Sequence, residues 1–283
     1  MALTELNLSP GAYVAPVFDW MNTNLHGLFA AISRFVEAVL GGVEVLLLMP
    51  PPYVMVAGVC LSAALFINLR SAVLAGVLLG FCWVSGFWNA SMQTIALVSV
   101  AVMIAVAIAF PLGILAARVK RFENAISPLL NIMQTIPPWV YLIPAVIIFS
   151  LGKVPAIMAT IIYGIPPMLR LTTLGFRQVP KDLLELGQAT GAKPSTILFK
   201  IELPNAMPTL LVGLNQCILM SLAMVVLAGL VGAGGLGAEV TRGLTRMEMG
   251  LGLRAGLAIV AVALLLDRLS RGLLDRRKSL LPR

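Results

Sequence analysis

The chain has 283 residues, of which 59% are hydrophobic and only 11% are charged, and its formal net charge is +8. Soluble globular domains carry about 25% charged residues, so the composition excludes that class and indicates an integral membrane protein. The positive charge does not indicate a nucleic-acid partner, because the basic residues form no stripe or face. They lie instead at the ends of apolar runs, as membrane topology requires.

Residues 1–49 precede the apolar segments, and we assign them to the extracytoplasmic side of the membrane. Within them, Arg34, Glu37 and Glu44 recur at helical spacing, and apolar residues occupy the other side of the same helix. This pattern predicts an amphipathic helix over 28–49. Such a helix lies along the membrane surface or braces a helical bundle, and a poorly inserting eighth span is the alternative.

Seven apolar segments follow, each near the length of about 20 residues that a transmembrane helix needs. We therefore predict an all-α membrane protein whose transmembrane domain covers residues 50–272. The seven segments are 51–69, 71–87, 91–117, 128–151, 154–170, 209–231 and 253–270.

Proline interrupts several of these segments. A proline inside a helix removes a backbone hydrogen bond and predicts a kink or a break. In a membrane such breaks are tolerated where neighbouring helices or a cavity satisfy the backbone, and broken helices around a cavity at the middle of the membrane are typical of a transporter. The interrupting residues are Pro111, Pro137, Pro138, Pro144, Pro166 and Pro167.

The distribution of Lys and Arg predicts the orientation of the chain. With the C-terminus placed inside, 15 of the 20 basic residues lie on the inner side, at position 70, at 118–121, at 170–200 and in the stretch 268–283. Cytoplasmic loops are enriched in basic residues, so the count predicts an outer N-terminus and an inner C-terminus. The basic tail, residues 273–283, is then cytoplasmic and able to contact anionic membrane lipids.

A charged segment, DLLELGQATGAKPSTILFKIELPNAMP, interrupts the apolar runs at 182–208. Pro180 and Asp182 predict the start of a helix over 181–190, because proline suits the first turn and an acidic residue complements the helix dipole. Gly191 predicts the end of that helix, since glycine readily adopts the left-handed conformation of a C-cap.

A second short helix is expected from Pro194 through Ile201, with Pro204 and Pro208 ending it before the next span. Connections between helices in a bundle need about two to eight residues. A segment this long therefore favours a docking surface for a cytoplasmic partner over a passive connector.

The same segment resembles the EAA motif of ABC importer permeases. The motif reads here as Glu185-Leu186-Gly187, three residues, Gly191, nine residues, and Ile201-Glu202-Leu203-Pro204, with Leu186 and Gly187 in place of two alanines. The resemblance implies that the coupling region, 175–208, inserts a coupling helix into a groove on a separate ATP-hydrolysing subunit. The implied coupling residues are Glu185, Leu186, Gly187, Gly191, Ile201, Leu203 and Pro204.

Three further segments, 128–180, 211–237 and 242–270, are similar to the membrane subunits of glycine betaine/proline importers. The resemblance covers roughly residues 50–272 and implies the type I ABC importer transmembrane fold. It also implies a permease of the bacterial inner membrane that carries glycine betaine, choline, proline betaine, trimethylamine N-oxide or a similar solute.

The implied partners are a second copy of the permease, two ATP-binding subunits and a periplasmic or extracellular substrate-binding protein. The alternatives are a permease for another small solute, such as a methionine-type importer, and an ATP-independent carrier. The sequence contains no phosphate-binding loop of the Gly-x-x-x-x-Gly-Lys-Ser/Thr type, so ATP and Mg are expected on the partner ATPase and this chain is expected not to be an enzyme. Its three cysteines have no metal-ligand spacing, and no metal site is predicted.

Polar and aromatic residues within the spans are candidates for a solute path. Aromatic faces attract quaternary ammonium groups through cation–π interactions, and uncharged polar side chains suit a permeable cavity. Aromatic residues at the lipid interface and hydrogen bonds between helices are the alternatives. The candidates are Gln134, Thr135, Trp139, Tyr141, Tyr163, Asn215 and Gln216.

A glycine-rich loop lies after the sixth apolar segment, within VGAGGLGAEV at 231–240. Glycine permits unusual backbone angles and close approach. The loop is either a mobile outer gate near the docking site of the binding protein or a tight turn between spans. Its glycines are Gly232, Gly234, Gly235 and Gly237.

Overall fold

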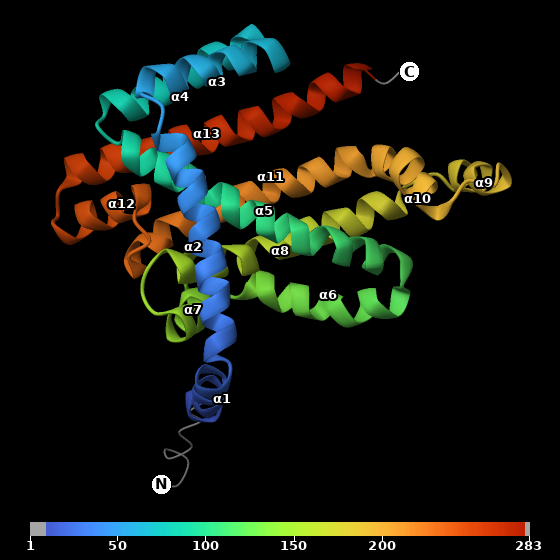
Figure 1. Ribbon diagram of the computed structural model, residues 1–283, viewed down its shortest axis with the longest axis horizontal. Coiled ribbons are helices and arrows are strands. Elements are labelled where there is room, and N and C mark those ends of the chain that lie inside the picture. Colours follow the sequence, from blue (N-terminus) through green and yellow to red (C-terminus); the bar gives the residue numbers. More distant parts are fainter. Residues whose placement is uncertain (1–9, 281–283) are drawn as a thin grey trace, which may run out of the picture.

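The computed structural model describes residues 10–280, with side chains described for residues 15–272. Residues 10–280 consist of helices joined by short turns and contain no strand (Figure 1), as the sequence predicts. The predicted basic tail and the first residues of the N-terminal segment lie outside the described side chains. The helices are α1 (Pro10–Asn24), α2 (His26–Leu48), α3 (Pro52–Phe66), α4 (Leu69–Val84), α5 (Trp88–Arg118), α6 (Lys120–Thr135), η1 (Pro138–Tyr141), α7 (Leu142–Phe149), α8 (Lys153–Arg177), α9 (Lys181–Ala189), α10 (Pro194–Ile197), η2 (Leu198–Glu202), α11 (Leu203–Ala228), η3 (Gly229–Val231), α12 (Gly235–Thr245) and α13 (Met249–Leu280).

Three long helices, α5, α8 and α11, form the centre of the bundle, and α8 packs against both of the others. Small residues let these helices approach closely. A Cβ atom on Gly113 of α5 would lie 2.5 Å from Cβ of Thr172 on α8, and one on Gly164 of α8 would lie 2.9 Å from Sγ of Cys217 on α11. The bundle has two distinct ends, with α9 and α10 at one and α12 at the other (Figure 1).

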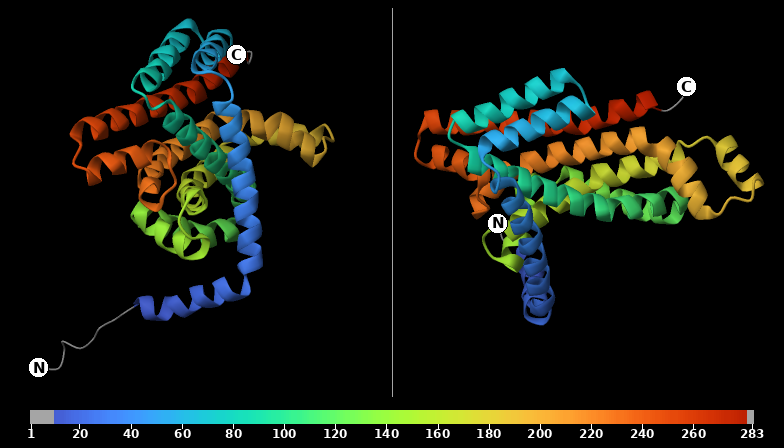
Figure 2. Two further views of the ribbon diagram at one scale, coloured as in Figure 1. Left: turned by 60° about the vertical axis from the view of Figure 1, so that its left-hand side comes forward. Right: turned by 45° about the horizontal axis from the view of Figure 1, so that its top comes forward.

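Helix α2 confirms the helix predicted at 28–49 and begins slightly earlier, at His26. It runs across the long helices rather than along them (Figures 1 and 2). Its buried residues, Val36 and Leu40, belong to the main hydrophobic core, and Glu44 forms an ion pair of 2.7 Å with Lys153 at the start of α8. These contacts fit a helix that braces the bundle.

Within residues 10–280, four helical stretches are long and apolar enough to cross a membrane, namely α5, α8, α13 and the continuous run Pro194–Val231. Two bent pairs, α2 with α3 and α6 with α7, raise the number to six if each pair counts as one span. Helices α3 and α4 have 15 and 16 residues and pack against each other. The count of seven spans stays a prediction.

The apolar segment predicted at 128–151 is not one straight span. Helix α6 ends at Thr135, and the chain bends by 110° before α7. The break follows from Pro137 and Pro138, which have no N–H to donate to the carbonyls of the last turn of α6. The hydroxyl of Tyr141 donates to the Met133 carbonyl instead, so one of the orphaned acceptors is satisfied from beyond the bend.

The other prolines do not break their helices, contrary to expectation. Pro111 lies within the continuous α5, and Pro166 and Pro167 lie within the continuous α8. Both helices are held by neighbours along their length, and tertiary packing offsets the lost backbone hydrogen bonds. Pro144 lies in the first turn of α7, where the missing N–H has no partner within the helix.

Candidate coupling site and solute path

Helix α9 begins at Lys181 and ends at Ala189, as predicted, and Gly191 has the predicted left-handed conformation with φ +70°. Two hydrogen bonds close the end of the helix. The Gly191 N–H donates to the Gln188 carbonyl at 2.9 Å, and the Ala192 N–H donates to the Gly187 carbonyl at 3.1 Å. This is the Schellman arrangement of a glycine-terminated helix, and it reverses the chain tightly toward α10.

The predicted end of the second short helix at Pro204 is wrong. Helix α10 passes into the π-helical turn η2 and then into α11, which continues through Pro204 and Pro208 to Ala228. The N–H of Leu203 donates to the Leu198 carbonyl, five residues back. This wider turn shifts the hydrogen-bond register just before Pro204 and makes room for a residue without an N–H. We call residues 181–202, that is α9, α10 and η2, the coupling element.

Gly187 brings the two arms of the coupling element together. A Cβ atom on Gly187 would lie 2.7 Å from Cδ1 of Ile201 and 3.3 Å from Cγ1 of Ile197. Gly187 is buried, whereas Glu185 is exposed and Leu186 is 61% exposed. The motif residues therefore divide into those that hold the element together and those on its surface. Gly187, Ile201, Leu203 and Pro204 are buried or half-buried, and Glu185, Leu186 and Gly191 are exposed.

Ion pairs lie at the helix ends around the coupling element, and one of them includes a residue of the element itself. Arg118, the last residue of α5, forms an ion pair of 2.8 Å with Glu202 of η2. At the start of α6, Glu123 pairs with Arg177 of α8 and with Lys120 at 2.9 Å. Arg177 and then Lys120 lower the pKa of the Glu123 carboxyl to about 2. The basic residues predict orientation from the sequence, and their spacing contains no signal for these pairs.

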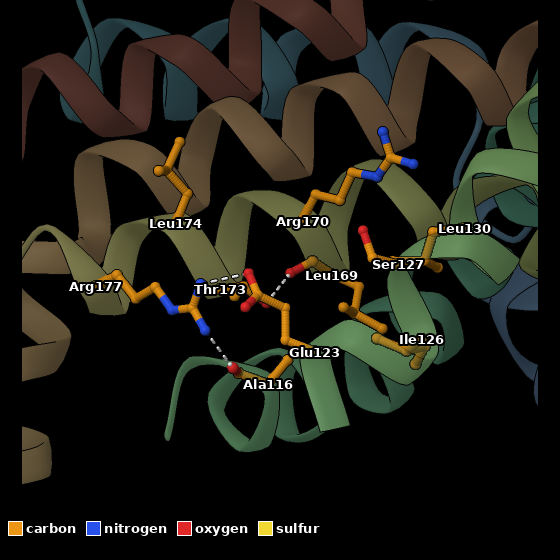
Figure 3. A pocket seen from close by; sticks show the side chains of 10 residues that line it. All are labelled: Ala116, Glu123, Ile126, Ser127, Leu130, Leu169, Arg170, Thr173, Leu174 and Arg177. Carbon is orange, nitrogen blue, oxygen red and sulfur yellow. Dashed lines mark hydrogen bonds and ion pairs between the residues drawn. The ribbon is translucent and has the colours of Figure 1, made fainter. Parts of the chain in front are cut away.

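A cavity of about 230 Å³ lies between α6 and α8, beside these ion pairs (Figure 3). Arg170 borders it and donates to Oδ1 of Asn131 at 2.5 Å. The cavity combines apolar walls with two guanidinium groups and one carboxylate, and none of the predicted path residues lines it. Its lining residues are Ala116, Glu123, Ile126, Ser127, Leu130, Leu169, Arg170, Thr173, Leu174 and Arg177.

Five of the predicted path residues gather at the bend between α6 and α7. The rings of Tyr141 and Tyr163 lie 6.0 Å apart, and Trp139 is 56% exposed. Gln134 and Thr135 are exposed at the end of α6.

The other two path candidates lie on α11, away from the bend. Asn215 is 6% exposed, and its Oδ1 accepts a long hydrogen bond of 3.5 Å from Ser270 of α13. Gln216 is exposed. The chain by itself thus forms an aromatic group at the bend and directs Asn215 toward a helix contact.

The glycine-rich loop is a closely packed turn. Gly232, Gly234 and Gly235 have φ values of +81°, +79° and +66°, which other residues rarely adopt. A Cβ on Gly237 would lie 2.2 Å from the Val225 carbonyl oxygen, so this end of α12 rests directly on α11. We call residues 229–237 the glycine turn.

Side chains of α5 hold the start of α12. The Gly235 N–H donates to Oε1 of Gln93 at 3.0 Å, and the Leu236 N–H donates to Oγ1 of Thr94 at 2.9 Å. Gln93 and Thr94 are not among the residues predicted from the sequence, because no local pattern distinguishes a polar side chain that caps another helix.

Residues 109–279 match the family model described as binding-protein-dependent transport system inner membrane component. The chain belongs to this family. It is therefore a transporter subunit of an ABC importer rather than an enzyme, and the family is a component of the inner membrane.

The similar proteins with curated names are permease proteins of transport systems, which agrees with this family. The chain is 41% identical over 260 residues to the glycine betaine/proline betaine transport system permease protein ProW of Escherichia coli (strain K12), which covers 92% of this chain and 73% of that protein. It is 38% identical to the glycine betaine transport system permease protein OpuAB of Bacillus subtilis (strain 168), over 92% of this chain and 93% of that protein.

The fold has a solved counterpart in the MetNI methionine ABC transporter in its inward-facing conformations. The two chains superpose with a TM-score of 0.56 at 26% identity, over 64% of this chain and 92% of the MetNI chain. The predicted type I ABC importer transmembrane fold is thus confirmed.

Proposed function

We propose that this chain is the transmembrane permease subunit of an ATP-driven importer for betaine-type solutes, which carry a quaternary amine or a related zwitterion. The observation that carries the proposal is the similarity to ProW, at 41% identity over 92% of the chain. The relatives also include the trimethylamine N-oxide permease protein TmoV of Ruegeria pomeroyi (strain ATCC 700808 / DSM 15171 / DSS-3), at 38% identity over 71% of this chain. The methionine transporter is similar in fold at lower identity, which favours the betaine class.

In the proposed complex two permease copies bind two ATP-binding subunits on the cytoplasmic side and a substrate-binding protein on the outer side. ATP and Mg belong to the ATP-binding subunits. The proposed orientation has the N-terminus outside and the C-terminus inside, because most basic residues then lie in the cytoplasm. The coupling element, at the α9 end of the bundle (Figure 1), is on that side.

The coupling element has the features of a docking surface. Its exposed apolar side chains, Leu183, Leu186 and Phe199, are 37%, 61% and 63% exposed. The same element exposes charged side chains, namely Lys181, Asp182, Glu185, Lys193 and Lys200. Apolar side chains surrounded by charge suit a groove on a partner protein. Glu185 adds a carboxylate for a basic group of that partner.

Transmission from the partner follows from the continuity of the chain. Because α10, η2 and α11 form one helical run, movement of the coupling element on ATP binding reorients α11 within the bundle. The two copies then alternate between inward-facing and outward-facing states, and hydrolysis resets them. The aromatic group Trp139, Tyr141 and Tyr163 lies at the bend where α6 gives way to α7, and it offers ring faces to a passing trimethylammonium group.

The test is reconstitution in proteoliposomes with the cognate ATPase and binding protein. We expect ATP-dependent uptake of radiolabelled glycine betaine, and competition by trimethylamine N-oxide, choline or proline betaine identifies the preferred solute. Uptake of methionine alone would overturn the betaine assignment. Uptake at the same rate without ATP would overturn the importer mechanism.

A further inference from the structure

We propose that α5 is a second mechanical link between the coupling element and the glycine turn, closed by Arg118 and Glu202 at one end and by Gln93 and Thr94 at the other. The inference rests on the proposed function and goes beyond the EAA-type motif, which contains none of the three α5 residues. It assigns these four residues a positioning role in the transport cycle.

At the α9 end of the bundle, an ion pair joins α5 to η2. Arg118 and Glu202 are 84 positions apart in sequence and lie within 2.8 Å of each other. The Glu202 side chain is only 14% exposed and that of Arg118 is 51% exposed. Among the described residues, no other ion pair is formed by either of them. The pair is thus the charged connection between α5 and η2.

Helix α5 connects the two ends of the bundle. Helix α5 has 31 residues without a break, a length of about 46 Å at 1.5 Å per residue. Side chains of α8 bind the backbone of α5 in its last two turns, beyond Pro111. Thr173 donates to the Gly113 carbonyl at 3.1 Å, and Arg177 donates to the Ala116 carbonyl at 3.0 Å. These contacts favour movement of α5 as one rigid body.

At the other end of the bundle, side chains of α5 cap the start of α12. The first N–H groups of a helix have no partner within the helix, and Gly234 offers no side chain to cap α12. Gln93 and Thr94 of α5 accept from Gly235 and Leu236 instead. Thr94 is 1% exposed, and a Cβ on Gly235 would lie 2.7 Å from its Oγ1. The start of α12 is therefore oriented by α5.

The covalent route from the coupling element to α12 runs through α11 and the glycine turn. Three left-handed glycines interrupt the helical backbone along that route, although α12 also rests on α11 at Gly237. The link through α5 bypasses the turn. When the coupling element moves, the ion pair carries the end of α5 with it, and the Gln93 and Thr94 contacts carry the start of α12.

The test is a charge reversal with rescue in the full transporter. Arg118→Glu and Glu202→Arg are made singly and together, and solute uptake per ATP hydrolysed is measured. We expect each single variant to lose at least about fivefold, the lower end of the range for coupled sites, and the double reversal to recover most of the loss. The matched control is Arg271→Glu, which breaks an ion pair of the same length, 2.8 Å, within α13, and we expect it to keep the wild-type ratio.

A second readout separates this link from the proposed function. Hydrogen exchange at the amides of Gly235 and Leu236 is measured in the purified complex without any solute. We expect faster exchange in Thr94→Val and in Arg118→Glu, and recovery in the double reversal. Unchanged exchange in Arg118→Glu, or failure of the double reversal to restore it, overturns the link. Absence of betaine uptake by the wild-type complex overturns the proposed function and leaves the exchange result decisive for the link.

Discussion

At one proline-containing turn of this molecule the helix continues, and at another it ends. At the coupling element, the helix passes through Pro204 because the π-helical turn η2 shifts the hydrogen-bond register before it. At the end of α6, two consecutive prolines end the helix, and the chain bends by 110°. The number of missing N–H groups does not decide the outcome, because α8, packed between α5 and α11, continues through the adjacent Pro166 and Pro167. A proline therefore marks a place of altered hydrogen bonding, and the neighbouring residues decide between continuity and a bend.

The coupling element is where we expect the largest effect of a single substitution. Gly191→Pro cannot adopt φ +70° and also removes the N–H that bonds Gln188, so the Schellman turn is lost. We predict that the complex still assembles in the membrane and hydrolyses ATP, but that uptake falls to background in proteoliposomes.

The control for that variant is Gly191→Asn, because asparagine tolerates the left-handed conformation. Asparagine is expected to retain most of the uptake. Normal uptake by Gly191→Pro would contradict the coupling role of this turn.

The next largest effect of a substitution is expected at the bend between α6 and α7. Tyr141→Phe removes the hydroxyl that satisfies the half-buried Met133 carbonyl, and the net contribution of one such hydrogen bond to stability is about 0.5–1.5 kcal/mol. We predict a lower thermal unfolding midpoint in detergent. Tyr163→Phe is the matched control, because its ring lies beside Tyr141, and it is expected to unfold at the wild-type temperature. Equal midpoints for both variants would argue against the role of the Tyr141 hydroxyl in closing the bend.

The packing of the coupling element allows a finer test. Gly187→Ala places a methyl group 2.7 Å from Cδ1 of Ile201, and overpacking of this kind costs about 1 kcal/mol when a flexible side chain can move. Ile201→Val removes the clashing atom. We therefore expect the double variant to be more stable than the sum of the two single changes, as measured by a double-mutant cycle on thermal unfolding. Strict additivity would show that the two arms of the element do not touch here.

The smallest effect is expected from a change of pH, which acts on thermal stability through Glu123 at the start of α6. The pKa of Glu123 is lowered from 4.5 to about 2 by Arg177 and Lys120, so the stabilisation from its charged form is complete above the ordinary value. It is lost only as the pH falls from about 4.5 toward 2. The contribution of Glu123 to thermal stability should thus be constant between about pH 8 and pH 5.5. A difference between wild type and Glu123→Gln that changes across that interval would place the pKa of Glu123 higher.

Much of the coupling element could be predicted from local sequence. Capping residues act within one turn of a helix, so Pro180, Asp182 and Gly191 were sufficient to define α9 nearly to the residue. The continuity through Pro204 could not be predicted in the same way. It depends on the register of hydrogen bonds in η2, which the packing of Ile197 and Ile201 against Gly187 favours.

The candidate site likewise has one part that local sequence predicts and another part that it does not predict. The spacing of the EAA-type motif is local and predicts the element that we propose faces a partner. The pairs Arg118–Glu202 and Arg177–Glu123, and the caps from Gln93 and Thr94, join segments that are 54 to 142 positions apart. No local pattern encodes which charges meet at that separation.

The sequence by itself determined the class of the protein, its helical content and the turn at Gly191, because composition, periodicity and capping are properties of short stretches. Only the tertiary structure decided that α2 crosses the bundle, that the glycine turn is fixed to α5, and that proline breaks one helix and not another. These features depend on which helices pack together, and a polar group or a missing hydrogen bond has its consequence only once its neighbours are in place.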